Sequence, residues 1–109
     1  MNELQTIAAV NIQSNFDLEE ITGDEKTFDK IRVLLIDKIN FLLDHNFEKL
    51  LWLLYRIDVS EEKAKAALAE NTIQKPSEVL ADLIIERQIE KAKTRIQYRA
   101  EHNNDRGDF

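Results

Sequence analysis

The feature that most limits the fold of this chain is its shortage of turn-forming residues. Only two glycines and one proline occur among 109 residues. Sheet proteins of this size need many tight turns, and tight turns draw on Gly, Pro, Asn and Asp. Helices joined by short connections need far fewer such residues. The sequence therefore predicts an all-α protein, a helical bundle of about four to five helices with a long C-terminal helix.

The size and composition are those of one globular domain. Hydrophobic residues make up 43% of the chain and charged residues 33%, which is too apolar for a disordered protein. Apolar runs are far shorter than the ~20 residues of a transmembrane helix, and the N-terminus has no basic leader. We expect residues 1–99 to form a single helical domain and residues 100–109 a disordered tail, in a cytoplasmic protein without membrane contact.

A long helix is predicted between residues 24 and 45. Asp24 is suited to cap its start, and Glu25 would place negative charge at the positive end of the helix dipole. Apolar side chains then recur at intervals of three or four and share one face of the helix: Phe28, Ile31, Leu35, Ile39 and Leu42. A shorter amphipathic helix is expected before it, from Asn2 to about Gln13.

The densest apolar run of the chain is LLWLLY, residues 50–55. A helix over residues 47–56 would have no polar side here, and a helix that is apolar all round is normally buried. A strand is the weaker alternative, because the run is rich in leucine and no partner strand is evident. We therefore expect Trp52 and its leucine neighbours at the centre of the bundle, covered by the helix at 24–45 and by the last helix.

Two more helices follow. Ser60 is suited to cap the first, which begins with Glu61 and Glu62. Pro76 stands where proline is favoured, at the start of a helix, and the last helix is expected to run from Ser77 to about Tyr98. Its first half is broadly apolar, whereas its second half narrows to one apolar seam.

That narrow seam predicts a homodimer. Its residues are spaced four, three and four, which is the spacing of helices that pair in coiled coils, and the small alanine would let two helix axes approach closely: Ile85, Ile89, Ala92 and Ile96. The alternative is that residues 1–23 fold back and cover the seam within one chain. The dimer is slightly favoured, because residues 1–23 are only weakly apolar.

A ladder of four cations follows the same helix, and we call it the basic face: Arg87, Lys91, Arg95 and Arg99. Like charges four residues apart cost roughly 0.2–0.5 kcal/mol per pair. A solvent-exposed face explains the ladder adequately, because the helix dipole and a Glu90–Lys93 pair would offset the repulsion between the cations. The sharper interpretation is that an acidic surface docks on it. That surface would be an acidic protein partner or this chain's own acids in residues 17–25, and nucleic acid is an unlikely third occupant.

No enzyme signature is present. The two histidines, His45 and His102, belong to no metal-binding spacing, and the chain has no cysteine. Arg56 and Asp58 are interpreted as a partly buried ion pair with a structural role rather than a catalytic one. We predict no catalytic, cofactor-binding or metal-binding residue and no cofactor.

The runs LLYRIDVSEEK and LIIERQIEKAKTR resemble segments of small all-helical bacterial proteins that have no assigned function. The likeness covers residues 28–99 and implies a bacterial, cytosolic, all-α protein. It transfers no active-site residue. The seam and the basic face of the last helix favour a non-enzymatic protein–protein interaction or adaptor protein that forms a homodimer. The alternative is a nucleic-acid-associated accessory protein that uses the basic face.

Overall fold

The computed structural model of the chain describes residues 2–18, 27–69 and 75–107. Within these residues the secondary structure consists of α-helices without strands, which confirms the predicted fold class. Five helices are present in the described part: α1 (Glu3–Phe16), α2 (Thr27–His45), α3 (Phe47–Ile57), α4 (Glu61–Leu68) and α5 (Pro76–Gly107).

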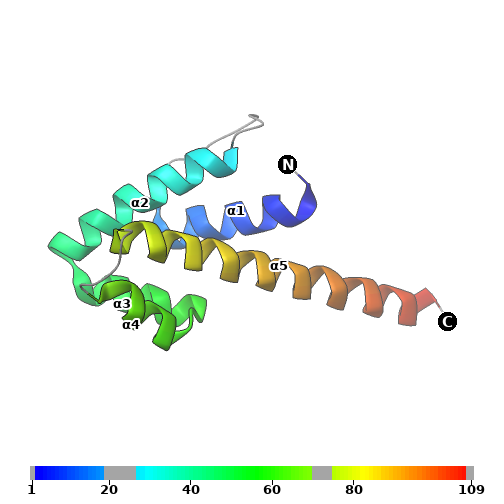
Figure 1. Cartoon of the computed structure of the whole chain (residues 1–109). Helices are drawn as coiled ribbons and strands as arrows, with labels where there is room; N and C mark the ends of the chain where they lie inside the picture. The colour runs from blue at the N-terminus through cyan, green and yellow to red at the C-terminus, as the bar shows by residue number, and fades with distance from the viewer. Residues whose placement is uncertain (1, 19–26, 70–74, 108–109) are drawn as a thin grey trace.

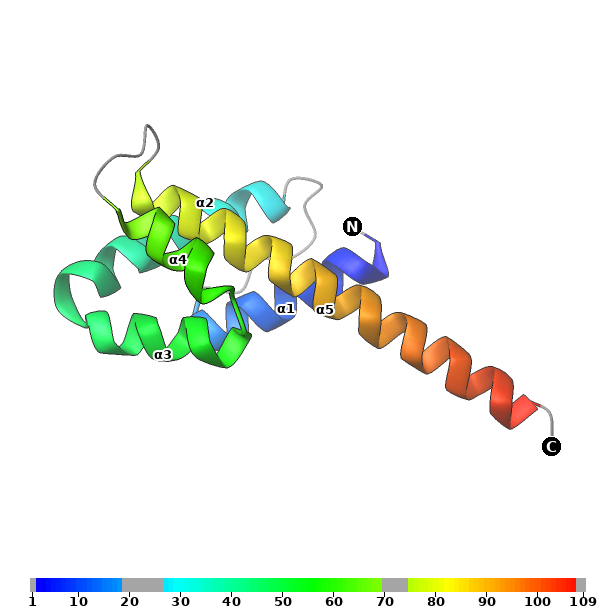
Figure 2. The ribbon, with the colours of Figure 1, turned by 60° about the horizontal axis from the view of Figure 1, so that its bottom comes forward.

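The long helix α5 organises the bundle, since each of the other four helices contacts it. Helix α1 lies alongside α5 and runs in the opposite direction, and α3 and α4 lie on the other side of the body from the start of α2 (Figure 1). The second half of α5 projects beyond the body in both views (Figure 2). The molecule is accordingly long, with extents of 56 × 32 × 24 Å.

The core sits between α2 and the first half of α5. The apolar face predicted for α2 is confirmed, because Ile31, Leu35, Ile39 and Leu42 are all buried. They join one cluster with apolar side chains of the other helices, among them Ile12 and Phe16 of α1, Leu50 and Leu53 of α3, and Leu80 and Ile84 of α5. An ion pair between Arg32 and Asp82, with 2.8 Å between Nε and Oδ1, ties α2 to α5 at the edge of this core.

Helix α1 has a well-formed start and extends further than expected. The Asn2 side chain accepts a hydrogen bond from the backbone N–H of Gln5 at 2.8 Å, and the Gln5 side chain accepts one from the Asn2 backbone N–H at 3.3 Å. The helix ends at Phe16 instead of Gln13, because the last turn buries the Phe16 ring in the core. Asp17 then adopts the left-handed conformation and caps it.

The end of α2 and the boundaries of α3 and α4 follow the predictions closely. Helix α2 ends at His45, and the Asn46 side chain caps α3 by accepting from the Lys49 backbone N–H at 3.2 Å. Ser60 caps α4 as expected, by accepting from the Lys63 backbone N–H at 3.4 Å. The predicted cap Asp24 and the first-turn acid Glu25 lie outside the described residues.

The expectation that α3 is buried on all sides is wrong. Leu50, Leu53, Leu54 and Ile57 face the core, but Trp52, predicted at the centre of the bundle, is 54% exposed. The reason lies in the number of covering helices. Helices α2 and α5 pack on one side of α3, and no helix of the described part covers the other.

Helix α5 begins at Pro76, one residue before the expected Ser77, and continues to Gly107, well past the expected end near Tyr98. Residues 100–107, predicted as part of a disordered tail, are therefore helical in the structure. No proline or glycine interrupts the sequence between Tyr98 and Gly107. The His102 ring also lies against the Tyr98 ring, with centroids 3.7 Å apart, one helical turn further on.

Candidate interaction surface

The structure places the basic face along α5, from the body of the bundle into the projecting half. Its two ends form ion pairs within the chain. Arg87 pairs with Asp58 and Glu90, and Arg99 pairs with Glu3 at the start of α1. Within the described residues, these pairs leave the middle of the ladder for an outside partner.

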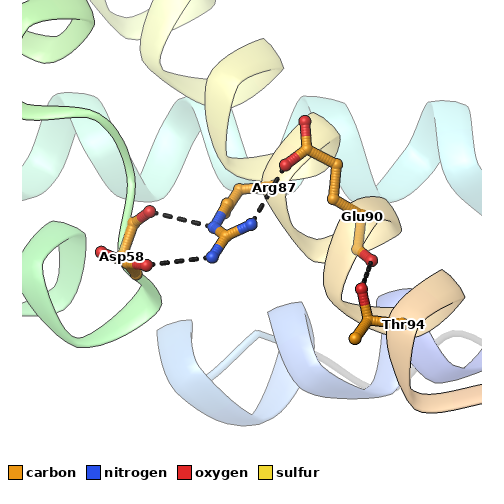
Figure 3. Close-up of polar contacts among 4 residues, drawn as sticks. All are labelled: Asp58, Arg87, Glu90 and Thr94. Atoms are coloured by element: carbon orange, nitrogen blue, oxygen red, sulfur yellow. Dashed lines mark hydrogen bonds and ion pairs between the residues drawn. The ribbon is translucent and has the colours of Figure 1, made fainter. Parts of the chain in front are cut away.

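At the first end, Arg87 clamps the α3–α4 connection onto α5 (Figure 3). Its Nε donates to the backbone carbonyl oxygen of Asp58 at 3.0 Å, and a terminal nitrogen donates to the Asp58 carboxylate at 2.9 Å. The other terminal nitrogen donates to the Glu90 carboxylate at 3.0 Å. These hydrogen bonds, first those to Asp58 and then that to Glu90, raise the pKa of the Arg87 guanidinium above its ordinary value. Arg87 therefore stays charged and holds three oxygens at once.

The predicted Arg56–Asp58 ion pair is absent, because the two side chains leave α3 in different directions. Asp58 is the C-terminal cap of α3 in the left-handed conformation, with φ of 69°, and it turns toward α5. Arg56 stays on the outer side of α3, where its guanidinium lies 5.2 Å from the centre of the Trp52 ring. The partner of Asp58 is Arg87, which no local spacing could indicate.

A shallow polar pocket of about 240 Å³ adjoins this clamp, and its lining includes Ser60, Lys63 and Glu86 besides the clamp residues. Its charges are of both signs. Ser60 caps α4, so its hydroxyl already accepts a hydrogen bond from the helix. The pocket residues hold the α3–α4 connection against α5. We find no arrangement of nucleophile and base among them.

Between the paired ends lie Lys91 and Arg95. Neither forms an ion pair in the part of the chain that the structure describes. Partial burial lowers the pKa of Lys91, and the neighbouring Arg87 charge lowers it further. Of the acids expected to cover the basic face, Asp17 is the cap of α1, and Glu19, Glu20, Asp24 and Glu25 lie outside the described residues. The acid that reaches the ladder from the N-terminal segment is Glu3.

The seam predicted for dimerisation lies where α1 packs on α5. Ala92 is buried within the single chain, at 1% exposure, and Ile85, Ile89 and Ile96 are partly buried. Helix α1 contacts α5 along this stretch, and its Glu3 reaches Arg99. Pairing of a second copy on this seam is not tested by a single chain, and it stays a prediction.

Four of the large apolar side chains that are exposed in the described residues lie on α3, where the sequence predicted burial. We call these side chains the aromatic stripe. They are Phe47 (43% exposed), Leu51 (44%), Trp52 (54%) and Tyr55 (85%). Phe47, Leu51 and Tyr55 follow one another at intervals of four and therefore form a row along the helix. This spacing was readable from the sequence, but which rows of α3 are covered was not.

An apolar groove of about 490 Å³ borders the stripe, between α3 and α4. Leu54 and Val59 line its floor together with Ala64 and Leu68 of α4, and Leu51 and Tyr55 belong to both groove and stripe. Glu61 and Lys65 stand in its lining as an ion pair at 3.3 Å. Grooves of this kind, apolar with a few polar groups, are where proteins bind other molecules.

Each of the two histidines lies against an aromatic ring one helical turn before it. The His45 ring stacks on Phe41, with centroids 4.4 Å apart, and the His102 ring lies against Tyr98 at an interplanar angle of 31°. Among the described residues no group of three or more His, Cys, Asp or Glu side chains could hold a metal ion. None of the described helices is both long enough and apolar enough to cross a bilayer.

Comparison with protein-family models, with curated proteins and with solved structures found no match. The resemblance to small bacterial helical proteins therefore stays a prediction.

Proposed function

We propose that this protein is a non-enzymatic interaction protein, in the cytoplasm, that binds a second polypeptide through the aromatic stripe and the adjoining groove. The observation that supports the proposal most directly is the exposure of Trp52, Tyr55 and Leu51 side by side on one helix. Large exposed apolar patches are uncommon on monomeric proteins and mark binding surfaces. Aromatic side chains also dominate the energy of protein interfaces.

The shape of the surface favours a helical segment as its ligand. The groove lies between two helices, and its apolar lining includes Leu54, Ala64 and Leu68. An amphipathic helix binds such a groove by laying its apolar face into it. The stripe beside the groove would widen the contact on one side.

The test is site-specific photo-crosslinking in cells. A benzophenone amino acid replaces Tyr55 on the stripe, and in a matched control it replaces Asp37, which is exposed on α2. We expect a covalent polypeptide adduct from position 55 and none from position 37. No polypeptide adduct at position 55, or equal adducts at both positions, would overturn the proposed function.

A second candidate is nucleic-acid binding by the middle of the basic face. Lys91 and Arg95 form no ion pair in the described part of the chain, and Tyr98 is exposed on the next turn of the projecting helix, where a base could stack. Fluorescence anisotropy with single-stranded RNA tests this candidate. Binding should weaken steeply with salt and be lost in a Lys91→Ala, Arg95→Ala variant. Lack of binding at low salt would exclude it.

A further inference from the structure

We propose that the polypeptide bound by the aromatic stripe is a second copy of this chain. The two copies would pair α3 against α3 in opposite directions, with Glu48 of one copy facing Arg56 of the partner subunit. This inference rests on the proposed function and specifies its partner.

The charges on α3 are arranged for pairing with an inverted copy of the same helix. Glu48, Trp52 and Arg56 are spaced by four, so they form a second row next to the row of Phe47, Leu51 and Tyr55. Glu48 and Arg56 are both exposed, and Trp52 lies midway between them. When two such rows meet in opposite directions around Trp52, each glutamate faces an arginine, and the contact occurs twice.

A parallel arrangement would bring like charges together at both ends of α3, with glutamate against glutamate and arginine against arginine. Antiparallel helices also place the negative end of one dipole beside the positive end of the other. Both effects favour the inverted pairing. The apolar centre of the contact would then consist of Leu51, Trp52 and Tyr55 from each copy, with the groove beside α3 leaving room for the partner's side chains.

The charges on α3, α4 and their connection do not favour a strongly acidic or basic partner. Residues 47–69 contain four acidic and four basic side chains. Glu61 and Lys65, which border the groove, already neutralise each other. A surface that is neutral overall, but has opposite charges at its two ends, is most complementary to an inverted copy of itself.

The seam on α5 is a poorer surface for a second copy in this conformation. Ala92 lies buried in the single chain, and a partner could reach it only if α1 left α5. The stripe on α3 needs no such rearrangement, because its four side chains are already exposed in the single chain.

The experiment uses the whole protein and two independent readouts. Sedimentation equilibrium over a wide concentration range gives the dissociation constant of the dimer. Trp52 is the single tryptophan of the chain, so its fluorescence emission reports directly on the stripe. We expect a dimer at high concentration, and a shift of the emission to shorter wavelength as the indole leaves water.

Charge reversal tests the register of the pairing. Glu48→Arg and Arg56→Glu each turn two attractive contacts into two repulsive ones, so each should weaken the dimer by about tenfold or more. The double variant restores opposite charges in the dimer, and its affinity should return to within about threefold of the wild type. Glu62→Arg, an exposed reversal on α4 outside the groove lining, is the matched control and should leave the affinity unchanged.

Circular dichroism checks that each variant keeps its helix content. Both reversals disfavour the dipole of α3, so a loss caused by helix fraying would be worse in the double variant, whereas a loss caused by mispaired copies would be repaired. A double variant as weak as the single ones would therefore overturn the inverted register.

Two other outcomes would overturn the inference. A protein that stays monomeric at millimolar concentration would exclude a second copy, and the crosslinking at Tyr55 would then decide separately whether another polypeptide binds there. A dimer that is indifferent to charge reversal on α3 but is lost in Ile89→Glu would place the contact on the α5 seam.

Discussion

Helix α3 is rich in apolar residues but partly exposed, whereas the seam of α5 has few apolar residues and these are buried or partly buried. Helix α3 is the most densely apolar part of the chain, and it leaves one whole side in solvent. The seam of α5 is a thin line of Ile85, Ile89, Ala92 and Ile96, yet α1 packs along it. The difference shows that the amount of apolar surface on a helix does not indicate which part of it the same chain will cover.

What covers the α5 seam is a helix of modest apolar character with small residues at the contact. Ala8, Ala9 and Ile12 of α1 are buried, and small side chains let two helices approach closely. The Glu3–Arg99 ion pair fixes the far end of α1 against α5. Helix α3 has no equivalent neighbour on its outer side in the described residues.

The largest effect is expected where α1 covers α5. Ala92→Glu would bury a carboxylate beneath α1, and we expect it to lower the free energy of unfolding by about 3 kcal/mol. Urea unfolding followed by circular dichroism measures the loss. The control is Ala100→Glu, which lies exposed on the projecting half and should have little effect. Equal stability of the Ala92→Glu variant and the wild type would mean that α1 does not cover the seam.

Substitutions of two adjacent residues of α3 compare its buried side with its exposed side. Leu53→Ala removes a buried side chain and should cost about 2 to 3 kcal/mol of stability. Trp52→Ala removes a larger but half-exposed one and should cost less than about 1 kcal/mol, including the loss of the Arg56 contact. Chemical unfolding at a protein concentration where the chain is monomeric compares the two. A larger loss for Trp52→Ala would contradict the exposed stripe.

The clamp that holds the α3–α4 connection on α5 is expected to contribute less. Arg87→Gln loses the hydrogen bonds to Asp58 and Glu90, and because both carboxylates are largely exposed, we expect a cost of only about 0.5–1 kcal/mol. Hydrogen exchange of the α4 amides should speed up more than that of the α2 amides. Uniform acceleration throughout the bundle would show that Arg87 supports the whole fold instead of this connection.

The smallest expected change is a gain in stability on replacing Lys91. Burial and the Arg87 charge lower the pKa of Lys91 from its ordinary value of 10.5, so the folded protein binds this proton less tightly than the unfolded chain. Stability should therefore rise as the pH increases from the lowered pKa toward 10.5. Lys91→Gln should stabilise the protein by about 0.2–0.5 kcal/mol at neutral pH, and its advantage should shrink at alkaline pH. Urea unfolding at both pH values tests this, with the exposed Lys93→Gln as the control; a constant advantage would refute the titration of Lys91 as its cause.

Most of the fold was predictable from local patterns. Ser60 and Pro76 mark helix starts by their own chemistry, and the buried face of α2 follows from the spacing of its apolar residues. These signals are local because a helix closes its hydrogen bonds within a few residues. Long-range pairs leave no such trace: Arg32 and Asp82 are 50 residues apart, and Asp58 and Arg87 are 29 apart.

The aromatic stripe was missed for a related reason. LLWLLY shows that every side of α3 can be apolar, but burial also depends on how many other helices surround it. The nearest clue is Tyr55, whose hydroxyl suits a position in contact with water. Only the positions of α2 and α5 determine that Leu53 faces the core while Trp52 faces solvent.

The projecting half of α5 also determines how the molecule tumbles. Its radius of gyration is 15.8 Å, whereas a compact chain of this length would have one of about 13 Å. Rotational diffusion is consequently anisotropic, and end-over-end rotation is slower than spinning about the long axis. Because the amide N–H bonds of a helix lie nearly parallel to its axis, those of α5 report mainly the slow rotation. Their nuclear spin relaxation should therefore differ from that of amides in helices inclined to α5, even if every helix is equally rigid.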